Sequence, residues 1–491
     1  MLLLTGCMVG PKYHPPAPSA TATAPPAAYK ESPTQFQVTD GWKVAQPQDA
    51  MLHGKWWEIY NDPELNALED KLNIDNQNIR QFFENFMEAR TLIAQARSQL
   101  YPTVGVSLSY SAARSSSNLT NSPNANTGRV SSIGSLLGDV SWAPDLWGKV
   151  RNAVHEQQYN AQLSAADLEN EKLTEQASLA AFFFEIRGQD ALQKLLNDTV
   201  EADKKALELA RARYETGIDD RISLVEAEAT LQSVQSQATN LGVARAQFEH
   251  AIAVLVGANP SEFSIPVKPL LTNAPAIPLG MPSVLLERRP DIAASERRMA
   301  AANAQIGIAY AAYYPSLNIS ASYGHESTNF SHFFDQPSRF WSVGPSMSET
   351  IYDGGLRRAT VNQFITTYNA DVASYRQTVL TAFQQVEDSL AAVRLLSQQI
   401  LQQQQAVTSL EEALKLEFAR YELGVDPYLN VVTVQTALLN NQQTLASLHV
   451  QEMTASVQLI EALGGGWDRS QLPTPAEVSK KLNRTETTIE Q

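Results

Sequence analysis

Seven histidines and one cysteine are the side chains of this sequence most able to bind a metal or act as a nucleophile. The histidines lack the regular spacing of zinc ligands, and only His325 and His332 share a predicted loop, where plain solvation explains them best. The sequence also has no phosphate-binding glycine loop ending in Lys-Ser/Thr, no nucleophile elbow and no His-Glu-x-x-His. We therefore expect no catalytic site, no metal site and no cofactor, and the protein is not expected to be an enzyme.

The only cysteine, Cys7, suggests a different chemistry. It follows Leu4, Thr5 and Gly6, and small residues before a cysteine are typical of a bacterial lipobox, where the cysteine is lipidated after cleavage. A lipoprotein signal also needs a charged segment and a longer apolar core, so residues 1–7 are interpreted as a truncated signal. We expect Cys7 to carry acyl chains, such as palmitate, that anchor the protein to a membrane. The alternative is a free thiol near the terminus.

Composition narrows the class of protein further. Among 491 residues, 37 Lys and Arg stand against 52 Asp and Glu, a net charge of −15 without any basic run. This balance argues against nucleic-acid binding, because phosphate contacts need clustered cations. One cysteine excludes an internal disulfide framework. No apolar stretch reaches the roughly 18 residues of a membrane-spanning helix, so a long, polar, helical body is favoured over an ordinary globular enzyme.

The chain contains an internal duplication. Residues 212–219 read Ala-Arg-Tyr-Glu-Thr-Gly-Ile-Asp, and residues 419–426 read Ala-Arg-Tyr-Glu-Leu-Gly-Val-Asp. The same displacement relates several glycines elsewhere in the chain, as expected of two copies of one structural unit. We therefore predict two repeats, over residues 65–257 and 290–464.

Each repeat is predicted to contain a helix, two strands, a very long helix, a tight turn and a shorter returning helix. Residues 148–214 and 356–421 lack proline and are rich in Ala, Leu, Gln and Glu, so each should form a helix roughly 100 Å long at 1.5 Å per residue. The returning helices, about 219–257 and 427–463, reach only roughly 55–60 Å. Each long helix should therefore pack against two shorter helices stacked end to end.

Four short segments alternate apolar residues with serine, glycine and other small residues, at about 103–110, 133–142, 316–323 and 341–349. One apolar face and one Ser/Gly face is the pattern of transmembrane β-strands, whose aromatic residues lie at the membrane interfaces. The alternative is a soluble antiparallel sheet half buried on helices. Four strands cannot close a membrane barrel, since the smallest have about eight. Several chains must then contribute strands, which also removes exposed sheet edges.

The segments outside the repeats complete the predicted organisation. Seven prolines between Pro11 and Pro33 predict an extended N-terminal arm, which with an equatorial contact covers residues 8–64. Residues 258–289 are expected to form an equatorial linker, and residues 465–491 a polar C-terminal tail.

Three stretches resemble the TolC-type outer-membrane efflux proteins, in their lipoprotein (NodT/OprM-like) branch. They are Gly-Lys-Trp-Trp at 54–57 with Asp-Pro-Glu-Leu at 62–65, Leu-Leu-Glu-Arg-Arg-Pro-Asp-Ile at 285–292, and the twin Arg-Tyr-Glu-x-Gly turns. Together with the duplication they cover the chain from about residue 42 to 467. The resemblance implies a mixed fold, an all-α barrel plus a transmembrane β-barrel. A homotrimer would form a twelve-stranded barrel in the outer membrane of a Gram-negative bacterium and a twelve-helix periplasmic tunnel.

The resemblance also implies partners. Such a duct receives small molecules from an inner-membrane pump, here expected to be of the RND type, through a periplasmic adaptor (membrane fusion protein), and it contacts outer-membrane lipid. The chain would thus be the passive exit duct of a tripartite efflux system, as in multidrug resistance. Two alternatives stay open: a lipid-anchored periplasmic coiled-coil scaffold or adaptor without a pore, and the exit duct of a type I protein secretion system.

Carried over by position, the family's functional residues fall at the hairpin tips, expected near 215–219 and 422–427. Adaptor contact falls on six tip residues: Thr216, Gly217, Ile218, Leu423, Gly424 and Val425. The gate falls on Arg420, Tyr421, Asp426 and Leu429. Leu429 would form an apolar ring by threefold symmetry. The other three would link the closed tips, so Arg420→Ser should raise resting leakage.

The predicted gate departs from the family at one position. The family's gate carboxylate corresponds to Thr433, so an acidic ring and cation selectivity are not expected at that level. The counterpart of Thr433 in the first repeat is Glu226, which either supplies a carboxylate from the other tip or is a solvated helix residue. Arg288-Arg289-Pro290-Asp291 is expected to be structural, since Pro and Asp suit a helix start.

Overall fold

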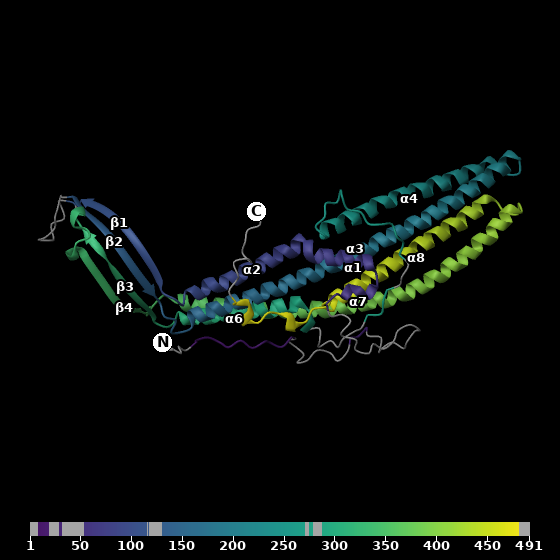
Figure 1. The fold of residues 1–491 in the computed structure, drawn as a ribbon. Helices are drawn as coiled ribbons and strands as arrows, with labels where there is room; N and C mark the ends of the chain where they lie inside the picture. Colours follow the sequence, from purple (N-terminus) through teal and green to yellow (C-terminus); the bar gives the residue numbers. More distant parts are fainter. Residues whose placement is uncertain are drawn as a thin grey trace.

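The computed structural model describes residues 8–18, 29–31, 54–114, 116, 130–270, 274–277 and 287–480. Within these residues the molecule is elongated, with a small sheet at one end and long helices extending to the other (Figure 1). The predicted lipidation site Cys7 lies outside the described residues, as do parts of the N-terminal arm, of the linker and of the tail.

The two repeats have helices of equal length. α3 (Lys149–Glu215) and α7 (Leu356–Glu422) have 67 residues each, and the returning helices α4 (Arg221–Leu255) and α8 (Tyr428–Ala462) have 35 residues each. At 1.5 Å per residue the long helices span about 100 Å. Each long helix packs against the helix that follows it, so the chain forms two long hairpins whose tips lie together at one end (Figure 1).

Where one helix was predicted over residues 65–100, the structure has two, α1 (Pro63–Asp75) and α2 (Gln77–Ser98). Asn76 interrupts them, because its backbone is extended and its side chain caps α2 by accepting a hydrogen bond from Ile79 N at 2.9 Å. Asn76 Nδ2 also donates to Leu255 O, the last residue of α4, at 2.9 Å. The break therefore lets α2 begin where α4 ends.

In the second repeat a different side chain joins the start of one short helix to the end of the other. α6 (Pro290–Ala311) begins beside the end of α8, where Arg289 Nη1 donates to Ala462 O at 3.0 Å. Arg289 also pairs with Asp291 at 2.6 Å, and Pro290 occupies the first helical position. α3 packs against α2 and α4, and α7 packs against α6 and α8, so each long helix lies along two shorter helices placed end to end. The Arg-Arg-Pro-Asp stretch makes structural contacts at this junction.

Four antiparallel strands form one sheet in the order β1-β2-β3-β4: β1 (Thr103–Arg114), β2 (Val130–Trp142), β3 (Ser316–Ser327) and β4 (Arg339–Ser348). Directly paired residues share a face of the sheet, and the register places Val106, Gly138, Tyr323 and Trp341 in one row. That face is apolar. The other is rich in serine, with cross-strand bonds such as Ser322 Oγ to Ser342 Oγ at 2.7 Å.

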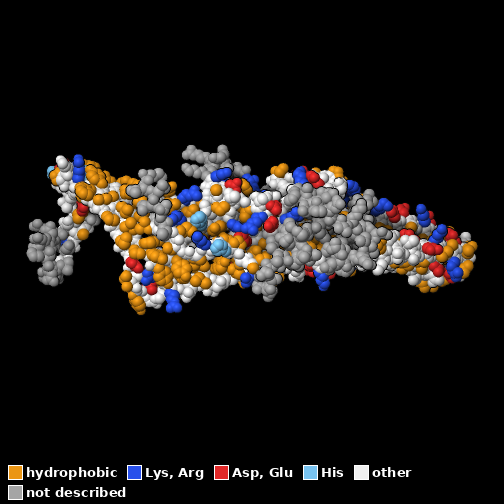
Figure 2. All heavy atoms as spheres, turned by 90° about the horizontal axis from the view of Figure 1, so that it is seen from below, with side chains coloured by type: hydrophobic (Ala, Val, Ile, Leu, Met, Phe, Trp, Pro, Cys, Tyr) orange, Lys and Arg blue, Asp and Glu red, His pale blue; other side chains and the backbone are white. Residues whose placement is uncertain are grey.

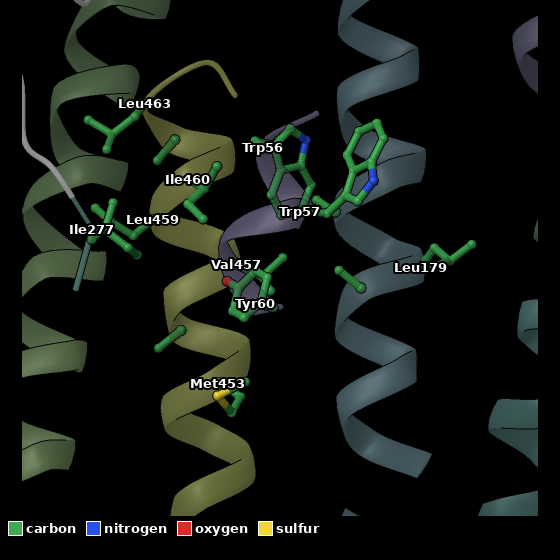
Figure 3. Close-up of a cluster of buried hydrophobic side chains, with 14 of the residues drawn as sticks. Trp56, Trp57, Tyr60, Leu179, Ile277, Met453, Val457, Leu459, Ile460 and Leu463 are labelled. Atoms are coloured by element: carbon green, nitrogen blue, oxygen red, sulfur yellow. The ribbon is translucent and has the colours of Figure 1, made fainter. Parts of the chain in front are cut away.

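The largest hydrophobic cluster lies where the short helices meet. The short helix η3 (Trp56–Tyr60) inserts its aromatic rings there, and Trp56 is 1% exposed. Tyr60 packs on Phe184 with ring centres 4.8 Å apart, and its hydroxyl bonds Ser456 Oγ at 2.8 Å. Figure 3 shows these rings between α3 and α8. Each large side chain buried in this way contributes about 1.5–3 kcal/mol, so η3 fixes the start of the first repeat to both hairpins.

The remaining short elements are η4 (Phe330–His332) and η5 (Gln336–Ser338) between β3 and β4, and η6 (Arg469–Gln471) and α9 (Pro475–Val478) after α8. α9 packs against α3. Among the helices of the described ranges, none is long and apolar enough to cross a membrane.

Candidate functional site at the hairpin tips

Two turns of the same geometry close the hairpins. The first tip (residues 216–220) has Gly217 at φ 75°, and Ile218 N donates to Arg213 O at 2.8 Å. The second tip (residues 423–427) has Gly424 at φ 71°, and its Val425 N donates to Arg420 O at 2.9 Å. A left-handed residue after a helix favours glycine, because a side chain would be strained there. The shared Gly therefore positions both tips.

All six residues predicted to contact an adaptor are exposed on these turns. Three of them are large and apolar: Ile218 is 65% exposed, Leu423 80% and Val425 61%. Isolated exposed apolar residues are ordinary, but here they gather at the extreme end of a polar molecule, as at protein–protein contacts. The tips are thus suited chemically to bind a partner with an apolar surface.

Each tip contains one ion pair between equivalent residues. Arg213 Nε lies 3.0 Å from Asp219 Oδ2 in the first tip, and Arg420 Nε pairs with Asp426 in the second. The hydrogen bond from Arg420 lowers the pKa of Asp426. The arginines differ in surroundings, since the side chain of Arg213 is 13% exposed and that of Arg420 is 54% exposed. The second pair is therefore a solvated surface pair, whose attraction is screened by water.

The first ion pair also joins the two hairpins. Tyr421 of α7 donates from its hydroxyl to Asp219 Oδ2 at 2.7 Å. The guanidinium of Arg213 lies 4.8 Å from the centre of the Tyr421 ring, and its Nη1 donates to Glu422 O at 3.1 Å. Burial alone would raise the pKa of Asp219, but the hydrogen bonds from Tyr421 and Arg213 lower it. We call this group of three side chains, Arg213, Asp219 and Tyr421, the tip link.

A small core supports the tip link. Tyr421 is 1% exposed and packs on Tyr428 with ring centres 5.2 Å apart, among alanines of α3 and α4. Burial raises the pKa of Tyr428 to about 12. Gln435 of α8 donates to Asp203 of α3, a second polar contact between the hairpins, and burial raises the pKa of Asp203. The two hairpins of one chain therefore meet near their tips in a buried, hydrogen-bonded seam.

The other predicted gate residues lie beside this seam. Leu429 projects from the first turn of α8 and is 54% exposed. Thr433, one turn further, is exposed and donates from its hydroxyl to Leu429 O at 2.8 Å. Glu226 of α4 is half-buried, and its charge contributes to the raised pKa of Tyr428. Glu226 is thus partly withdrawn from solvent, next to Ala227 of the small core.

Arg213 and Asp219 were not predicted as site residues, although both contact Tyr421 of the other hairpin. Both belong to the Ala-Arg-Tyr-Glu-x-Gly-x-Asp repeat, so the repeat itself was the available signal. The resemblance placed most of the predicted gate on the second copy, with Glu226 alone from the first. The structure makes Tyr421 a cross-hairpin donor and gives Arg420 and Asp426 a contact within their own tip.

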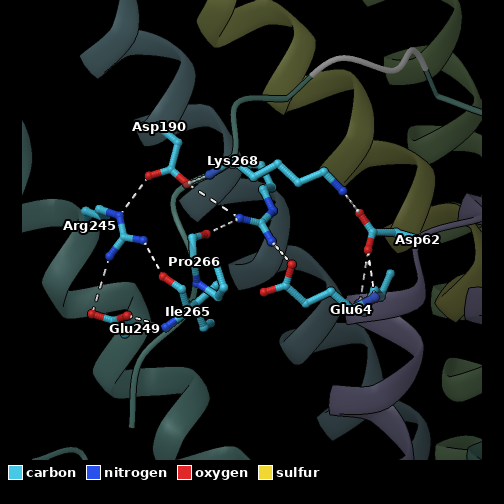
Figure 4. A network of polar contacts seen from close by, with 10 residues as sticks. Asp62, Glu64, Asp190, Arg245, Glu249, Ile265, Pro266 and Lys268 are labelled. Carbon is cyan, nitrogen blue, oxygen red and sulfur yellow. Dashed lines mark hydrogen bonds and ion pairs between the residues drawn. The ribbon is translucent and has the colours of Figure 1, made fainter.

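A buried charge network fixes the first hairpin at the level of the linker (Figure 4). Asp190, 1% exposed, accepts hydrogen bonds from Arg245 Nε at 2.7 Å and from Lys268 N at 2.8 Å. Arg187 donates to Glu64 at 2.5 Å. The network joins α1, α3, α4 and the linker, so the first hairpin is held rigidly far from its tip.

The described part of the chain holds no group of three or more His, Cys, Asp or Glu residues arranged to bind a metal ion.

Comparisons with known proteins agree with this arrangement. The model of the outer membrane efflux protein family matches residues 69–258 and 281–465. Outer membrane protein OprJ of Pseudomonas aeruginosa is 30% identical over 479 residues, covering 95% of this chain and 94% of OprJ. The toluene efflux pump outer membrane protein TtgC of Pseudomonas putida is 29% identical over 467 residues, covering 95% of this chain and 94% of that protein.

Solved structures extend the comparison to the fold. The outer-membrane channel OprN superposes with a TM-score of 0.82 at 26% identity, covering 94% of this chain and 100% of that chain. The CmeC outer membrane channel of Campylobacter jejuni superposes with a TM-score of 0.85 at 21% identity, covering 98% of this chain and 100% of that chain. These neighbours confirm the predicted combination of long helical hairpins and antiparallel strands. Because the family model matches both repeats, the chain belongs to the outer membrane efflux protein family: it is the outer-membrane channel component of a tripartite efflux system, a transport duct and not an enzyme.

Proposed function

We propose that three copies of this chain form the duct. The supporting observation is the sheet, which has four strands, two open edges and one apolar face, at the end of a helical body about 100 Å long. Four strands are too few to close a membrane barrel, whereas three chains supply twelve. Pairing β1 of one copy with β4 of the next removes both edges. The same symmetry places twelve long and returning helices around one axis.

The serine-rich face of the sheet would then line the exit. Such a surface offers hydroxyls and no deep apolar pocket, so it discriminates little among small molecules. Cargo choice is left to an inner-membrane pump, which we propose is of the RND type. The relatives named for toluene efflux and antibiotic efflux fit a duct for small, partly apolar molecules. A periplasmic adaptor would contact Ile218, Leu423 and Val425 at the exposed tips.

The tips would form the gate of the duct. In a trimer the exposed Leu429 side chains face the axis from three equivalent positions and make an apolar ring, which excludes water when narrow. The tip link and the Arg420–Asp426 pair hold the tips in the present conformation. An adaptor that binds a wider arrangement more tightly shifts the population toward the open duct. Acylation at Cys7 would add a lipid anchor.

Planar-bilayer conductance of the detergent-purified protein tests this proposal. Wild type should show small or flickering steps, and Leu429→Ser should enlarge them because a polar ring no longer excludes water. Ile222→Ser is the matched control, since Ile222 occupies the equivalent position of the first repeat and is 64% exposed. Equal steps in all three proteins would contradict the gate at Leu429. No steps from folded, oligomeric protein would contradict the duct.

A further inference from the structure

The far end of the sheet carries an aromatic cluster that the duct does not require. Between β3 and β4, the chain folds back so that Phe333 packs on the apolar face, where a side chain at Gly134 would meet its ring at 3.3 Å. Phe334 lies 5.0 Å from Phe333 and 5.8 Å from His325, measured between ring centres. Phe330 stacks on Phe333 and is 89% exposed. The exposed rings of Phe330 and Phe334 thus pack on the buried ring of Phe333.

The loop that presents these rings is fixed by its own hydrogen bonds. His332 Nδ1 lies 2.7 Å from Asp335 Oδ2, and Ser338 Oγ donates to His332 O at 2.7 Å. Asn329 caps η4 by accepting a hydrogen bond from Ser331 N at 3.2 Å. The aromatic cluster is therefore preorganised, so binding to it costs little ordering of the loop.

The charged side chains of the four strands lie on opposite faces of the sheet according to their sign. On the apolar face, the described strands carry two charged side chains, Arg114 and Arg339, each at the end of its strand farthest from the helices. On the serine-rich face they carry Asp139 and Glu326. Figure 2 shows hydrophobic side chains gathered over the sheet, with basic and histidine side chains at its far end. Within the described strands, the charged side chains at the outer margin of the apolar face are thus both basic, in a protein of net charge −15.

Arg339 lies beside the aromatic cluster in the register of the sheet. It pairs across the sheet with His325, whose ring contacts Phe333 and Phe334. Arg339 is exposed, and its guanidinium has no hydrogen bond or ion pair among the residues that the structure describes. An exposed guanidinium beside aromatic rings has two parallel donors available for a tetrahedral anion.

We propose that Arg339 and the exposed rings of Phe330 and Phe334 bind a phosphorylated lipid of the outer leaflet of the outer membrane. The helices extend into the periplasm, so the opposite end of the sheet lies at the outer leaflet. Below Arg339 the apolar face offers Trp341 and Val343 to acyl chains, 73% and 66% exposed. Aromatic rings partition to the headgroup region, and arginine reaches the phosphates there. The inference depends on the placement of the sheet in the outer membrane and not on the gate.

Native mass spectrometry of the full-length, detergent-purified protein with added lipid A tests the site. Lipid A carrying two phosphates should be retained by wild type, and dephosphorylated lipid A should be retained about tenfold less, since one charge-assisted contact is worth about that factor. Arg339→Gln should reduce retention of the phosphorylated lipid about tenfold. Phe330→Ser combined with Phe334→Ser should reduce retention of both lipids. Millimolar inorganic phosphate should not displace the lipid.

Two control variants separate this site from general charge effects. Arg211→Gln removes one positive charge at the opposite end of the molecule, and Glu326→Gln changes the other face of the neighbouring strand β3. Both variants should retain lipid A as wild type does. Conductance of Arg339→Gln should equal that of wild type, which separates the lipid site from the duct. Equal retention by wild type and Arg339→Gln, equal retention of the two lipids, or displacement by inorganic phosphate would each overturn the proposal.

Discussion

The two repeats have helices of equal length but hold them with different interactions. In the first, Asp190 binds Arg245 and the linker inside the protein. At the equivalent positions of the second, Ser397 donates to Glu452 at 2.5 Å. Duplication has therefore kept the backbone and the lengths, while the polar interior of each half has become specific to its neighbours.

An arginine that both repeats have at equivalent positions, Arg187 and Arg394, shows the same divergence. Arg187 donates to Pro266 O of the linker at 2.7 Å, whereas its counterpart Arg394 donates to Glu31 of the N-terminal arm at 2.8 Å. The arm is further held by Glu387, which accepts from Lys30 N at 2.7 Å. Two unrelated segments thus occupy corresponding places on the two hairpins. The first hairpin is fixed through buried charges, and the second through more exposed ones.

The two tips also differ in the burial of their equivalent residues. Tyr214 and Tyr421 are equivalent residues, but Tyr214 is 41% exposed and Tyr421 is 1% exposed. Only Tyr421 donates across to the other hairpin. The symmetric sequence therefore produces an asymmetric contact, in which the tyrosine donor comes from the second hairpin and its carboxylate acceptor from the first.

Asp190→Ala should have the largest effect on stability. It leaves the buried guanidinium of Arg187 and the half-buried guanidinium of Arg245 without their shared carboxylate, which costs about 3–5 kcal/mol. The counterpart Ser397→Ala removes one hydrogen bond to a carboxylate and should cost about 1.5 kcal/mol. Denaturant unfolding in detergent measures both, and hydrogen exchange at Lys268 N should accelerate only in Asp190→Ala. Similar losses of unfolding free energy in the two variants would contradict the proposed difference between the repeats.

Arg213→Gln should loosen the tips more than Arg420→Gln. Arg213 binds Asp219, Glu422 O and the ring of Tyr421, so its loss should cost about 2 kcal/mol of contact between the hairpins. Arg420 is more exposed, and water screens its attraction to Asp426. Resting conductance should rise clearly in the first variant and slightly in the second. The reverse order would place the latch at Arg420 and refute the role assigned to the tip link.

Acid should weaken the tip link within a narrow window. Because the pKa of Asp219 is lowered in the folded protein, its ionised form stabilises the link at all pH values above the ordinary pKa of about 4. That contribution is lost as the pH falls through the lowered pKa. Conductance at pH 5 should therefore match conductance at pH 7 and should rise only below about pH 4. In Asp219→Asn the rise should be absent, and a rise near pH 6 would point to another group.

Much of the fold follows from local sequence patterns. Proline-free runs rich in Ala, Leu, Gln and Glu extend over both long helices, and Gly217 and Gly424 mark their ends. Alternation of apolar and small residues indicates the strands. The break at Asn76 was not predictable from residue type, because asparagine favours caps but also occurs within α1 and α2, as Asn73 and Asn78. The contact that distinguishes Asn76 is with Leu255 O, far along the chain.

The candidate site was only partly predictable for the same reason. Exposure of the turn residues follows from the turns themselves. The contact between Tyr421 and Asp219 depends on how two hairpins lie together, which no local pattern encodes. One sequence difference does carry a signal: α4 begins with Arg221 and α8 with Tyr428. The buried Tyr428 ring packs on Tyr421 and completes the small core that the tip link requires.

The asymmetry of the tips is tested most directly by single-channel conductance of Tyr421→Phe and Tyr214→Phe. Each variant removes one hydroxyl from equivalent tyrosines and preserves the ring. Losing the bond to Asp219 costs about 1 kcal/mol, so Tyr421→Phe should open about five times as often as wild type. Tyr214→Phe should open as often as wild type. Equal behaviour of the two variants would contradict a duct held closed through the tip link.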